Sequence, residues 1–198
     1  MRVSGNTILI TGGTSGIGFE FAAQLLKLGN TVTITGRDQS RLEEAQRKLP
    51  GILTFQSDVS DPKAIPVLFE AVIKKFPALN VLINNAGIMR KINFQGTGND
   101  TANGLEDISR EIETNLIGPV RMAKQLLPHL KTQKVAAIVN VSSGLAFVPF
   151  PIARSIALPK QVCIPSRNLC VCNSRTPGLR YLSWLPRQLR RRCGWCGG

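Results

Sequence analysis

Short apolar runs alternate with longer amphipathic segments through the first three quarters of the chain. The runs are rich in β-branched and aliphatic residues and fall at residues 7–11, 31–35, 52–56, 81–84 and 136–141. The segments with apolar residues at helical spacing fall at residues 17–28, 40–49, 62–76 and about 105–130. This alternation is typical of βαβ units, and it predicts an α/β fold with a mostly parallel sheet.

Turn and capping residues separate these segments. Gly29-Asn30 ends the first helical segment, and Ser40 with Glu43 has the spacing of a capping box that opens the second. Asp61-Pro62 predicts the start of the third helix, with proline in its first turn. A loop rich in glycine and asparagine is expected over residues 89–104.

The composition changes abruptly near residue 154. The chain has 198 residues and a net charge of +13, yet residues 1–153 hold all 12 acidic residues and 16 of the 25 Lys and Arg. Residues 154–198 hold the other nine basic residues, all five cysteines, both tryptophans and the one tyrosine. Six prolines between positions 149 and 186 interrupt every candidate helix, at about 3 kcal/mol for each proline inside a helix. We therefore expect an α/β domain over residues 1–153 and a basic, irregular or disordered tail over residues 154–198.

Two features bear on where the protein resides. No run approaches the ~20 apolar residues of a membrane-spanning helix. No charged-then-apolar leader precedes the first strand. We therefore expect a soluble, cytoplasmic protein that does not bind membranes.

The strongest chemical motif lies between the first strand and the first helix. It is the segment Thr11-Gly12-Gly13-Thr14-Ser15-Gly16-Ile17-Gly18. Gly12 permits a sharp turn, Gly16 lets the backbone approach a pyrophosphate, and Gly18 allows helix and strand to pack closely. The helix amides and dipole then face the phosphates. A glycine-rich loop alone is also typical of ordinary turns, but this strand–turn–helix context predicts a dinucleotide site that includes Thr14, Ser15 and Ile17.

The end of the second strand bears on which dinucleotide binds. That strand ends in Gly36-Arg37-Asp38. An acidic side chain here binds the ribose 2′-hydroxyl of NAD, whereas an arginine pairs with the 2′-phosphate of NADP. Arg37 favours NADP, although Asp38 keeps NAD open and Arg37 could equally be a solvated surface residue.

Together with four further motifs, these segments resemble the short-chain dehydrogenase/reductase family. The four are Asp58-Val59 after the third strand, Asn84-Asn85-Ala86-Gly87 after the fourth, Asn115 in the long helix, and Val139-Asn140-Val141-Ser142-Ser143 at the fifth. Order and spacing agree over about residues 5–153. The resemblance implies a three-layer Rossmann fold with strand order 3-2-1-4-5-6-7, which we expect to be truncated here after strand five.

The resemblance also implies roles for the cofactor-binding positions. Asp58 and Val59 border the adenine. Asn85, Ala86 and Gly87 line the cofactor and steady the sheet. The implied reaction is hydride transfer between a nicotinamide dinucleotide and a small alcohol or carbonyl compound.

The implied catalytic positions are Asn115, which holds a proton-relay water, and Ser143, which hydrogen-bonds the substrate oxygen. Taken alone, Asn115 could be a polar residue satisfied within its helix, and Ser143 part of a strand-end turn. The family's Tyr-x-x-x-Lys pair should follow Ser143 by thirteen positions, where the chain has Ile156 instead of tyrosine. Lys160 stands where the family's lysine is expected. Isoleucine has no proton to give, and positioned acid–base catalysis supplies about 10²–10⁴-fold in rate.

One lost base near the codon for Arg154 would account for the tail. The codons of residues 155–162 can be regrouped with the preceding base to encode V-Y-C-A-T-K-A-G, which places a tyrosine at position 156 and a lysine at position 160. Residues 168–178 and 184–189 regroup likewise to Q-S-L-R-V-Q-L-E-D-T-G and L-A-P-P-A-V. We interpret the tail as an out-of-frame remainder of the same family and expect a catalytically impaired chain.

Other functions remain open for this sequence. The chain could be a non-catalytic dinucleotide-binding protein. The tail cysteines, among them Cys193 and Cys196, could form a zinc site, and Arg190-Arg191-Arg192 beside Trp195 could contact nucleic acid. We favour neither a metal nor a nucleic-acid partner, because no predicted element holds either site.

The truncation also predicts low stability. Without the helix that carries Tyr-x-x-x-Lys, apolar residues of the long helical segment lose cover, and the family-type homo-oligomer interface is lost. These residues are Ile112, Leu116, Val120, Leu126 and Leu127. The fifth strand would also present a bare edge that invites pairing with other chains. We therefore expect aggregation.

Overall fold

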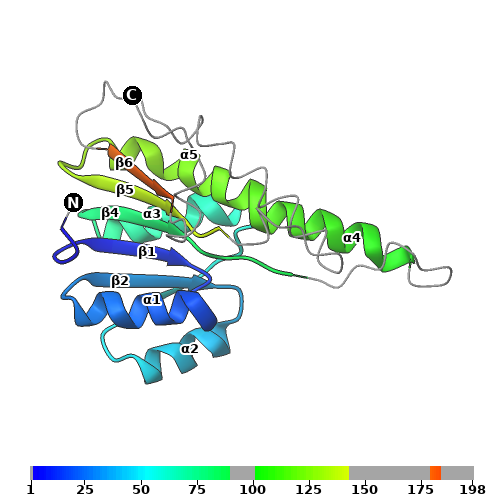
Figure 1. Cartoon of the computed structure of the whole chain (residues 1–198), viewed down its shortest axis with the longest axis horizontal. Helices are drawn as coiled ribbons and strands as arrows, with labels where there is room; N and C mark the ends of the chain where they lie inside the picture. The colour runs from blue at the N-terminus through cyan, green and yellow to red at the C-terminus, as the bar shows by residue number, and fades with distance from the viewer. Residues whose placement is uncertain (1, 90–100, 143–178, 184–198) are drawn as a thin grey trace, which may run out of the picture.

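The computed structural model describes residues 2–89, 101–142 and 179–183, with residues 101–104 and 179–183 described as backbone alone. Its sheet has six parallel strands in the order β3-β2-β1-β4-β5-β6 (Figure 1). The strands are β1 (Thr7–Thr11), β2 (Thr31–Gly36), β3 (Leu53–Gln56), β4 (Leu79–Asn84), β5 (Ala136–Asn140) and β6 (Leu179–Ser183).

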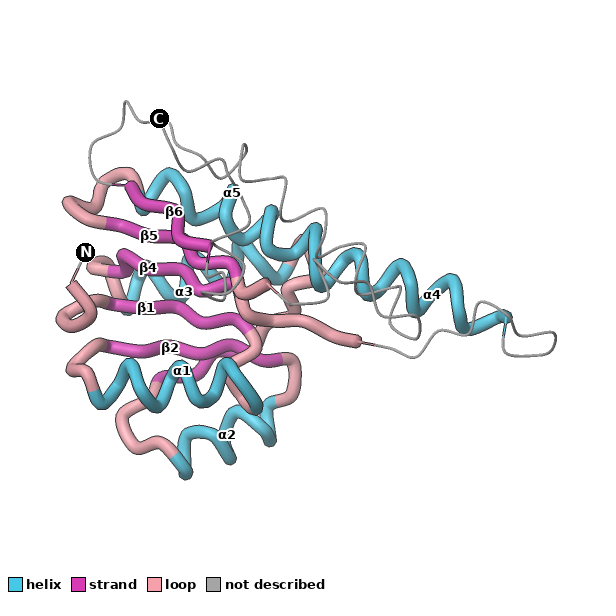
Figure 2. Tube along the Cα trace, in the orientation of Figure 1, coloured by secondary structure: helices cyan, strands magenta, loops and turns pink. Residues whose placement is uncertain are grey.

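Helices connect the strands and cover the sheet. They are α1 (Gly16–Lys27), α2 (Gln39–Lys48), α3 (Ala64–Lys75), α4 (Thr101–Ile112) and α5 (Gly118–Leu130), with the π-helical turn η1 (Glu113–Ile117) between α4 and α5. The long segment predicted as one helix is therefore helical throughout, but a wider turn interrupts it. Figure 2 shows α1 and α2 in front of the strands, and α3 and α5 behind them.

Strand residues alternate between two apolar cores, which makes the domain three-layered. Ile8 and Ile10 of β1 belong to the core that includes residues of α1 and α2, such as Ala22 and Leu42. Leu9, between them, belongs to the core that includes residues of α3 and α5. This period of two is what a strand buried on both faces requires. The predicted α/β Rossmann architecture is confirmed.

The predicted capping box at the start of α2 is wrong. Asp38 is the N-cap, because its carboxylate accepts a hydrogen bond from the Arg41 amide at 3.3 Å. Ser40 lies inside the helix and donates its hydroxyl to Asp38 at 2.6 Å. A carboxylate is a stronger acceptor than a hydroxyl and favours the positive end of the helix dipole, so Asp38 takes the capping position.

The prediction of no packed element after residue 153 is also wrong at one place. Residues Leu179–Ser183 form β6, which pairs in parallel with β5 from Ala136 to Asn140. The edge of β5 predicted to be bare is therefore occupied. Five residues are too few to give a periodic signal in the sequence. Because the hydrogen bonds between strands use backbone groups, the unpaired edge of β5 can make residues 179–183 a strand whatever their side chains.

The predicted loss of cover along the long helical segment is correct in part. Ile112 and Val120 are exposed, the latter by 54%, but Leu126 of α5 is completely buried in the core.

Within the described residues, no helix is both long enough and apolar enough to cross a membrane.

Candidate dinucleotide site

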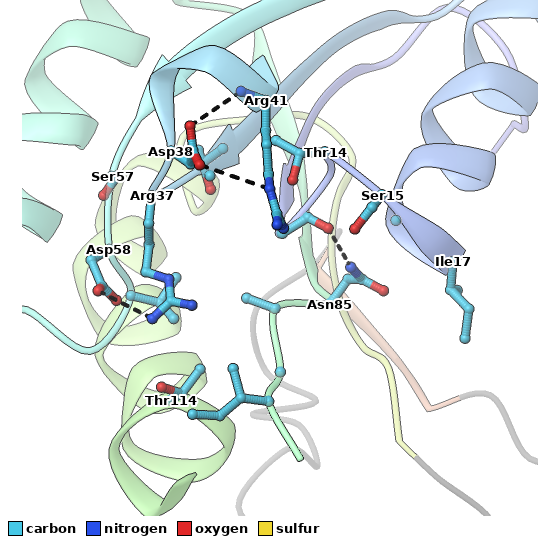
Figure 3. Close-up of a pocket in the computed structure, with 18 residues that line it drawn as sticks. Thr14, Ser15, Ile17, Arg37, Asp38, Arg41, Ser57, Asp58, Asn85 and Thr114 are labelled. Carbon is cyan, nitrogen blue, oxygen red and sulfur yellow. Dashed lines mark hydrogen bonds and ion pairs between the residues drawn. The ribbon is translucent and has the colours of Figure 1, made fainter. Parts of the chain in front are cut away.

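A cleft of about 570 Å³ lies at the carboxyl ends of the strands (Figure 3). In open α/β sheets, ligands bind in this position, outside the carboxyl ends and where the strand order reverses. Here the order reverses between β1 and β4. The cleft is lined by Gly12, Thr14, Ser15, Ile17, Gly18, Thr35, Gly36, Arg37, Asp38, Arg41, Ser57, Asp58, Val59, Asn85, Ala86, Gly87, Ile88 and Thr114.

The glycine-rich loop after β1 forms one wall of the cleft, and its glycines are needed for different reasons. Gly12 and Gly16 have φ of +66° and +56°, values that side-chain-bearing residues rarely adopt. No atom lies within 4 Å of where a Cβ of Gly16 would be, so that face of the loop is open. Gly18 packs so closely on Asn85 and on the Gly12 carbonyl that a Cβ would overlap both.

The segment after β4 holds this loop in place. The Asn85 side-chain amide donates to the carbonyls of Thr11 and Gly12 at 3.1 and 3.0 Å. In return, the Thr11 hydroxyl accepts the backbone amides of Asn85 and Ala86, both at 3.0 Å. These four bonds join two segments more than 70 residues apart, and they explain why Asn85 is required beside the loop.

Helix α1 begins directly at the glycine-rich loop and presents its first amides to the cleft. Its N-cap residue, Ser15, makes no side-chain capping bond within the described residues, and no acidic residue lies in the first turn. The first amides of a helix have no intrahelical acceptor, and the dipole makes this end positive. The arrangement is suited to an anionic group such as a phosphate.

Two opposite charges face each other across the far end of the cleft. The Arg37 guanidinium is 4.0 Å from a carboxylate oxygen of Asp58. The other oxygen of Asp58 accepts the amide and the hydroxyl of Ser60, at 2.9 and 2.7 Å. Arg37 is about half exposed, so its charge remains available to a ligand.

Asp38 is occupied by the start of α2. The Ser40 hydroxyl and then the Arg41 amide hold the pKa of the Asp38 carboxyl below its ordinary value of 3.8, so this side chain stays ionised. Arg41 adds an ion pair, with Nε 3.8 Å from the carboxylate. Figure 3 shows Arg41 projecting over the cleft from the side of Asp38. Asp38 therefore caps helix α2, while Arg41 places a second cation beside Arg37 at the same end of the cleft.

Three buried hydroxyls of the cleft wall have no hydrogen-bond partner within the described part of the chain. They belong to Thr35, Ser57 and Thr114, each less than 10% exposed. Buried polar groups are hydrogen-bonded in most proteins, so each of these hydroxyls is an exception. Their oxygens are almost wholly covered by protein atoms, and they polarise the cleft wall without facing the open cleft.

Asn115 lies at the centre of η1 and is 1% exposed. Its side-chain oxygen accepts the Ile88 amide at 2.9 Å, and its side-chain nitrogen donates to the Ile88 carbonyl at 2.8 Å. The side chain is therefore committed to the strand-like segment after β4. Pro119 has no N–H, so the helix cannot give the Asn115 carbonyl its usual i+4 donor.

Comparison with known proteins agrees with this geometry. Residues 6–155 match the sequence profile described as short chain dehydrogenase. The chain belongs to the short-chain dehydrogenase family. The uncharacterized oxidoreductase DltE of Bacillus subtilis (strain 168) is 48% identical over 155 residues, which cover 77% of this chain and 59% of that protein. The mouse dehydrogenase/reductase SDR family member 7B is 35% identical over 161 residues, which cover 75% of this chain and 47% of that protein.

Two solved structures share the fold. A 3-ketoacyl-(acyl-carrier-protein) reductase from Brucella melitensis, complexed with NADH, superposes with a TM-score of 0.81 at 27% identity, covering 93% of this chain and 76% of that one. A short-chain dehydrogenase from Streptomyces avermitilis gives a TM-score of 0.78 at 25% identity, covering 91% and 64%. The chain spans about half to three fifths of the length of the two curated relatives.

The structure brings together most positions that the sequence assigns to the family's cofactor. Eleven of the twelve line the cleft, and the twelfth, Gly16, begins the helix beside it. Of the predicted catalytic residues, Asn115 is placed as above, whereas Ser143 and Lys160 lie outside the described residues. The five tail cysteines lie outside them as well.

Sequence reasoning missed several residues of the cleft wall, notably Thr35, Arg41, Ser57, Ile88 and Thr114. Arg41 could have been found, because it lies in the first turn of the predicted helix, directly after the strand end that carries Arg37. Thr35 lies one residue before the end of β2, and Ser57 directly follows β3. The alternation of a strand places Thr35 on the opposite side of the sheet from Ile34. Ile88 and Thr114 carry no local signal, since their position follows from the pairing of Asn115 with the segment after β4.

Proposed function

We propose that residues 1–153 form a nicotinamide dinucleotide-binding domain and that the cleft holds the cofactor. The observation that carries this proposal is the convergence on one cleft of the glycine-rich loop, the start of α1 and the Asp58-Val59 segment. In this proposal the amides that begin α1 bind the pyrophosphate, and Asp58 and Val59 border the adenine. When bound, the nicotinamide ring supplies or accepts a hydride in exchange with an alcohol or carbonyl compound.

We further propose that NADP is preferred over NAD. The support is the charge arrangement at the end of β2. Arg37 and Arg41 both line the cleft, whereas the Asp38 carboxylate is occupied by the Ser40 hydroxyl and the Arg41 amide. Both bonds end on one carboxylate oxygen, and the other oxygen lies 3.8 Å from Arg41 Nε, so the negative charge of Asp38 is partly compensated. Two guanidinium groups suit a phosphate.

The 198-residue chain is proposed to bind the cofactor without turning over a substrate. Asn115 and Ser143 keep their assigned roles, the first at the relay and the second at the substrate oxygen. Lys160 stands in the register of the family's lysine, but Ile156 occupies the position of its acid–base partner. A side chain without an ionisable group cannot move a proton to or from the reacting oxygen. We further propose that residues 154–198 are an out-of-frame tail, of which residues 179–183 pair with β5.

Equilibrium titration of the purified chain tests the cofactor proposal. NADPH, NADP, NADH and NAD are titrated by isothermal calorimetry, and we expect NADPH and NADP to bind at least tenfold more tightly than NADH and NAD. Arg37→Gln and Arg41→Gln should each weaken NADP binding and leave NAD binding almost unchanged. Arg47→Gln removes an exposed charge from the last turn of the same helix and should bind like the unsubstituted chain. Absence of binding by all four dinucleotides would refute the proposal.

A further inference from the structure

Two segments far apart in the sequence form one side of the cleft. The loop after β3 contributes Asp58 and Val59, and the η1 turn contributes Thr114. Figure 3 shows the helix that carries Thr114 beside the loop that carries Asp58. The same turn carries Asn115, so any link between loop and turn also joins the adenine end of the site to its catalytic end.

Arg121 of α5 makes such a link with a single guanidinium nitrogen. Its Nη1 donates to the Glu113 carboxylate at 2.7 Å and to the Ser60 carbonyl at 3.2 Å. Nη1 carries two hydrogens, so one nitrogen can serve both acceptors. Both charged side chains are about one third exposed, which leaves the pair partly shielded from water.

Each end of this link is itself tied to a functional residue. Ser60 donates its amide and hydroxyl to Asp58, and the Asp61 amide closes the turn on the Asp58 carbonyl at 3.1 Å. Glu113 is the first residue of η1, and its carbonyl accepts the Gly118 amide in the i→i+5 pattern of a π-turn. Loss of the Arg121 side chain would therefore release the Ser60 carbonyl on one side and the Glu113 carboxylate on the other.

A steric contact holds the same two segments together. A Cβ on Gly118 would lie 2.8 Å from the Val59 carbonyl oxygen and 3.2 Å from the Glu113 carbonyl oxygen. The helix thus meets the loop backbone to backbone. Arg121 lies three residues beyond this contact and supplies the polar bonds beside it.

We propose that Arg121 is a positioning residue that fixes the adenine-bordering loop, residues 58–60, to the η1 turn that carries Asn115. This inference rests on the proposed cofactor site, because it assigns Asp58 and Val59 to the adenine. It adds that the geometry of the adenine end depends on a side chain of α5 that does not line the cleft. Lysine at position 121 keeps the charge but lacks the planar fork.

Amide hydrogen exchange on the apo chain tests the link directly. In Arg121→Met we expect exchange to rise at least tenfold at the amides of Ser60, Asp61 and Gly118, with no change in β1. Arg121→Lys should restore part of the protection. Lys124→Gln removes an exposed cation from the same helix and should leave all of these amides as they were.

Binding of half-cofactors adds a readout that general destabilisation does not reproduce. Arg121→Met should weaken binding of 2′,5′-ADP at least fivefold and leave binding of nicotinamide mononucleotide unchanged. Unchanged exchange at the three amides, or an equal rise throughout the sheet, would overturn the role of Arg121, as would equal weakening of both half-cofactors. If the unsubstituted chain binds no 2′,5′-ADP, the proposed preference for NADP fails, while the exchange comparison still decides whether Arg121 joins the two segments.

Discussion

Replacing the Thr11 hydroxyl should destabilise the domain and disorder its glycine-rich loop. Thr11 is 2% exposed and accepts the amides of Asn85 and Ala86. Thr11→Val keeps the shape of the side chain but leaves both amides without this acceptor. An unsatisfied buried donor costs about 1–3 kcal/mol, and both amides are only partly buried, so we expect a loss of about 2–3 kcal/mol. For a domain of this size, that loss lowers Tm by roughly 4–12 °C.

Thr33→Val is the matched control for this substitution. Thr33 is also completely buried in the sheet, but its hydroxyl has no partner within the described residues. Removing an unbonded buried hydroxyl relieves a desolvation penalty, so Thr33→Val should leave stability unchanged or raise it by about 1 kcal/mol. Urea unfolding followed by circular dichroism measures both variants, with the m-value as the check on two-state behaviour. Equal destabilisation by the two substitutions would refute the reasoning, since it would show that the hydrogen bonds of Thr11 add nothing to the free energy of unfolding.

Further expectations concern the gene, the chemistry, the response to acid and the association of the chain. Insertion of one base near codon 154 should open a frame with Tyr-x-x-x-Lys at positions 156 and 160, and a nucleotide sequence that cannot regroup in this way contradicts it. The chain should show no carbonyl-dependent oxidation of NADPH, whereas steady oxidation that Ser143→Ala abolishes would contradict this. Because the pKa of Asp38 lies below 3.8 in the folded chain, its capping of α2 should be complete above pH 3.8 and be lost as the pH falls through the lower, folded value. The NMR shift of the Arg41 amide follows this loss, and a pH-independent shift would argue against the cap. Light scattering should detect association, because Ile112 and Val120 are exposed, and a monodisperse monomer would show that these side chains drive none.

The parts of the fold that the sequence predicts well are those with strong local signals. The predicted bounds of β1 are those of the structure, because a buried parallel strand bounded by a glycine-rich loop is distinctive in composition. Most of the positions predicted to bind the cofactor line one cleft for a related reason. Glycines and asparagines at fixed offsets from strand ends have few other structural uses, so their spacing is specific.

The parts that the sequence does not predict depend on tertiary contacts. The π-turn around Asn115 follows from the Pro119 backbone and from the bonds between Asn115 and Ile88, which join segments 27 residues apart. β6 depends on an edge that the rest of the sheet supplies. Asp38 and Ser40 both have side chains suited to an N-cap, and local spacing favoured the wrong one.

The bonds between Asn85 and the glycine-rich loop have a consequence for the kinetics of ligand entry. The loop is tethered by bonds to the segment after β4 in the apo protein, so little backbone ordering remains to be done when a ligand arrives. Association should then follow single-exponential kinetics, with a rate constant proportional to ligand concentration. Loosening the tether would instead convert binding into a two-step process whose observed rate levels off at high ligand concentration.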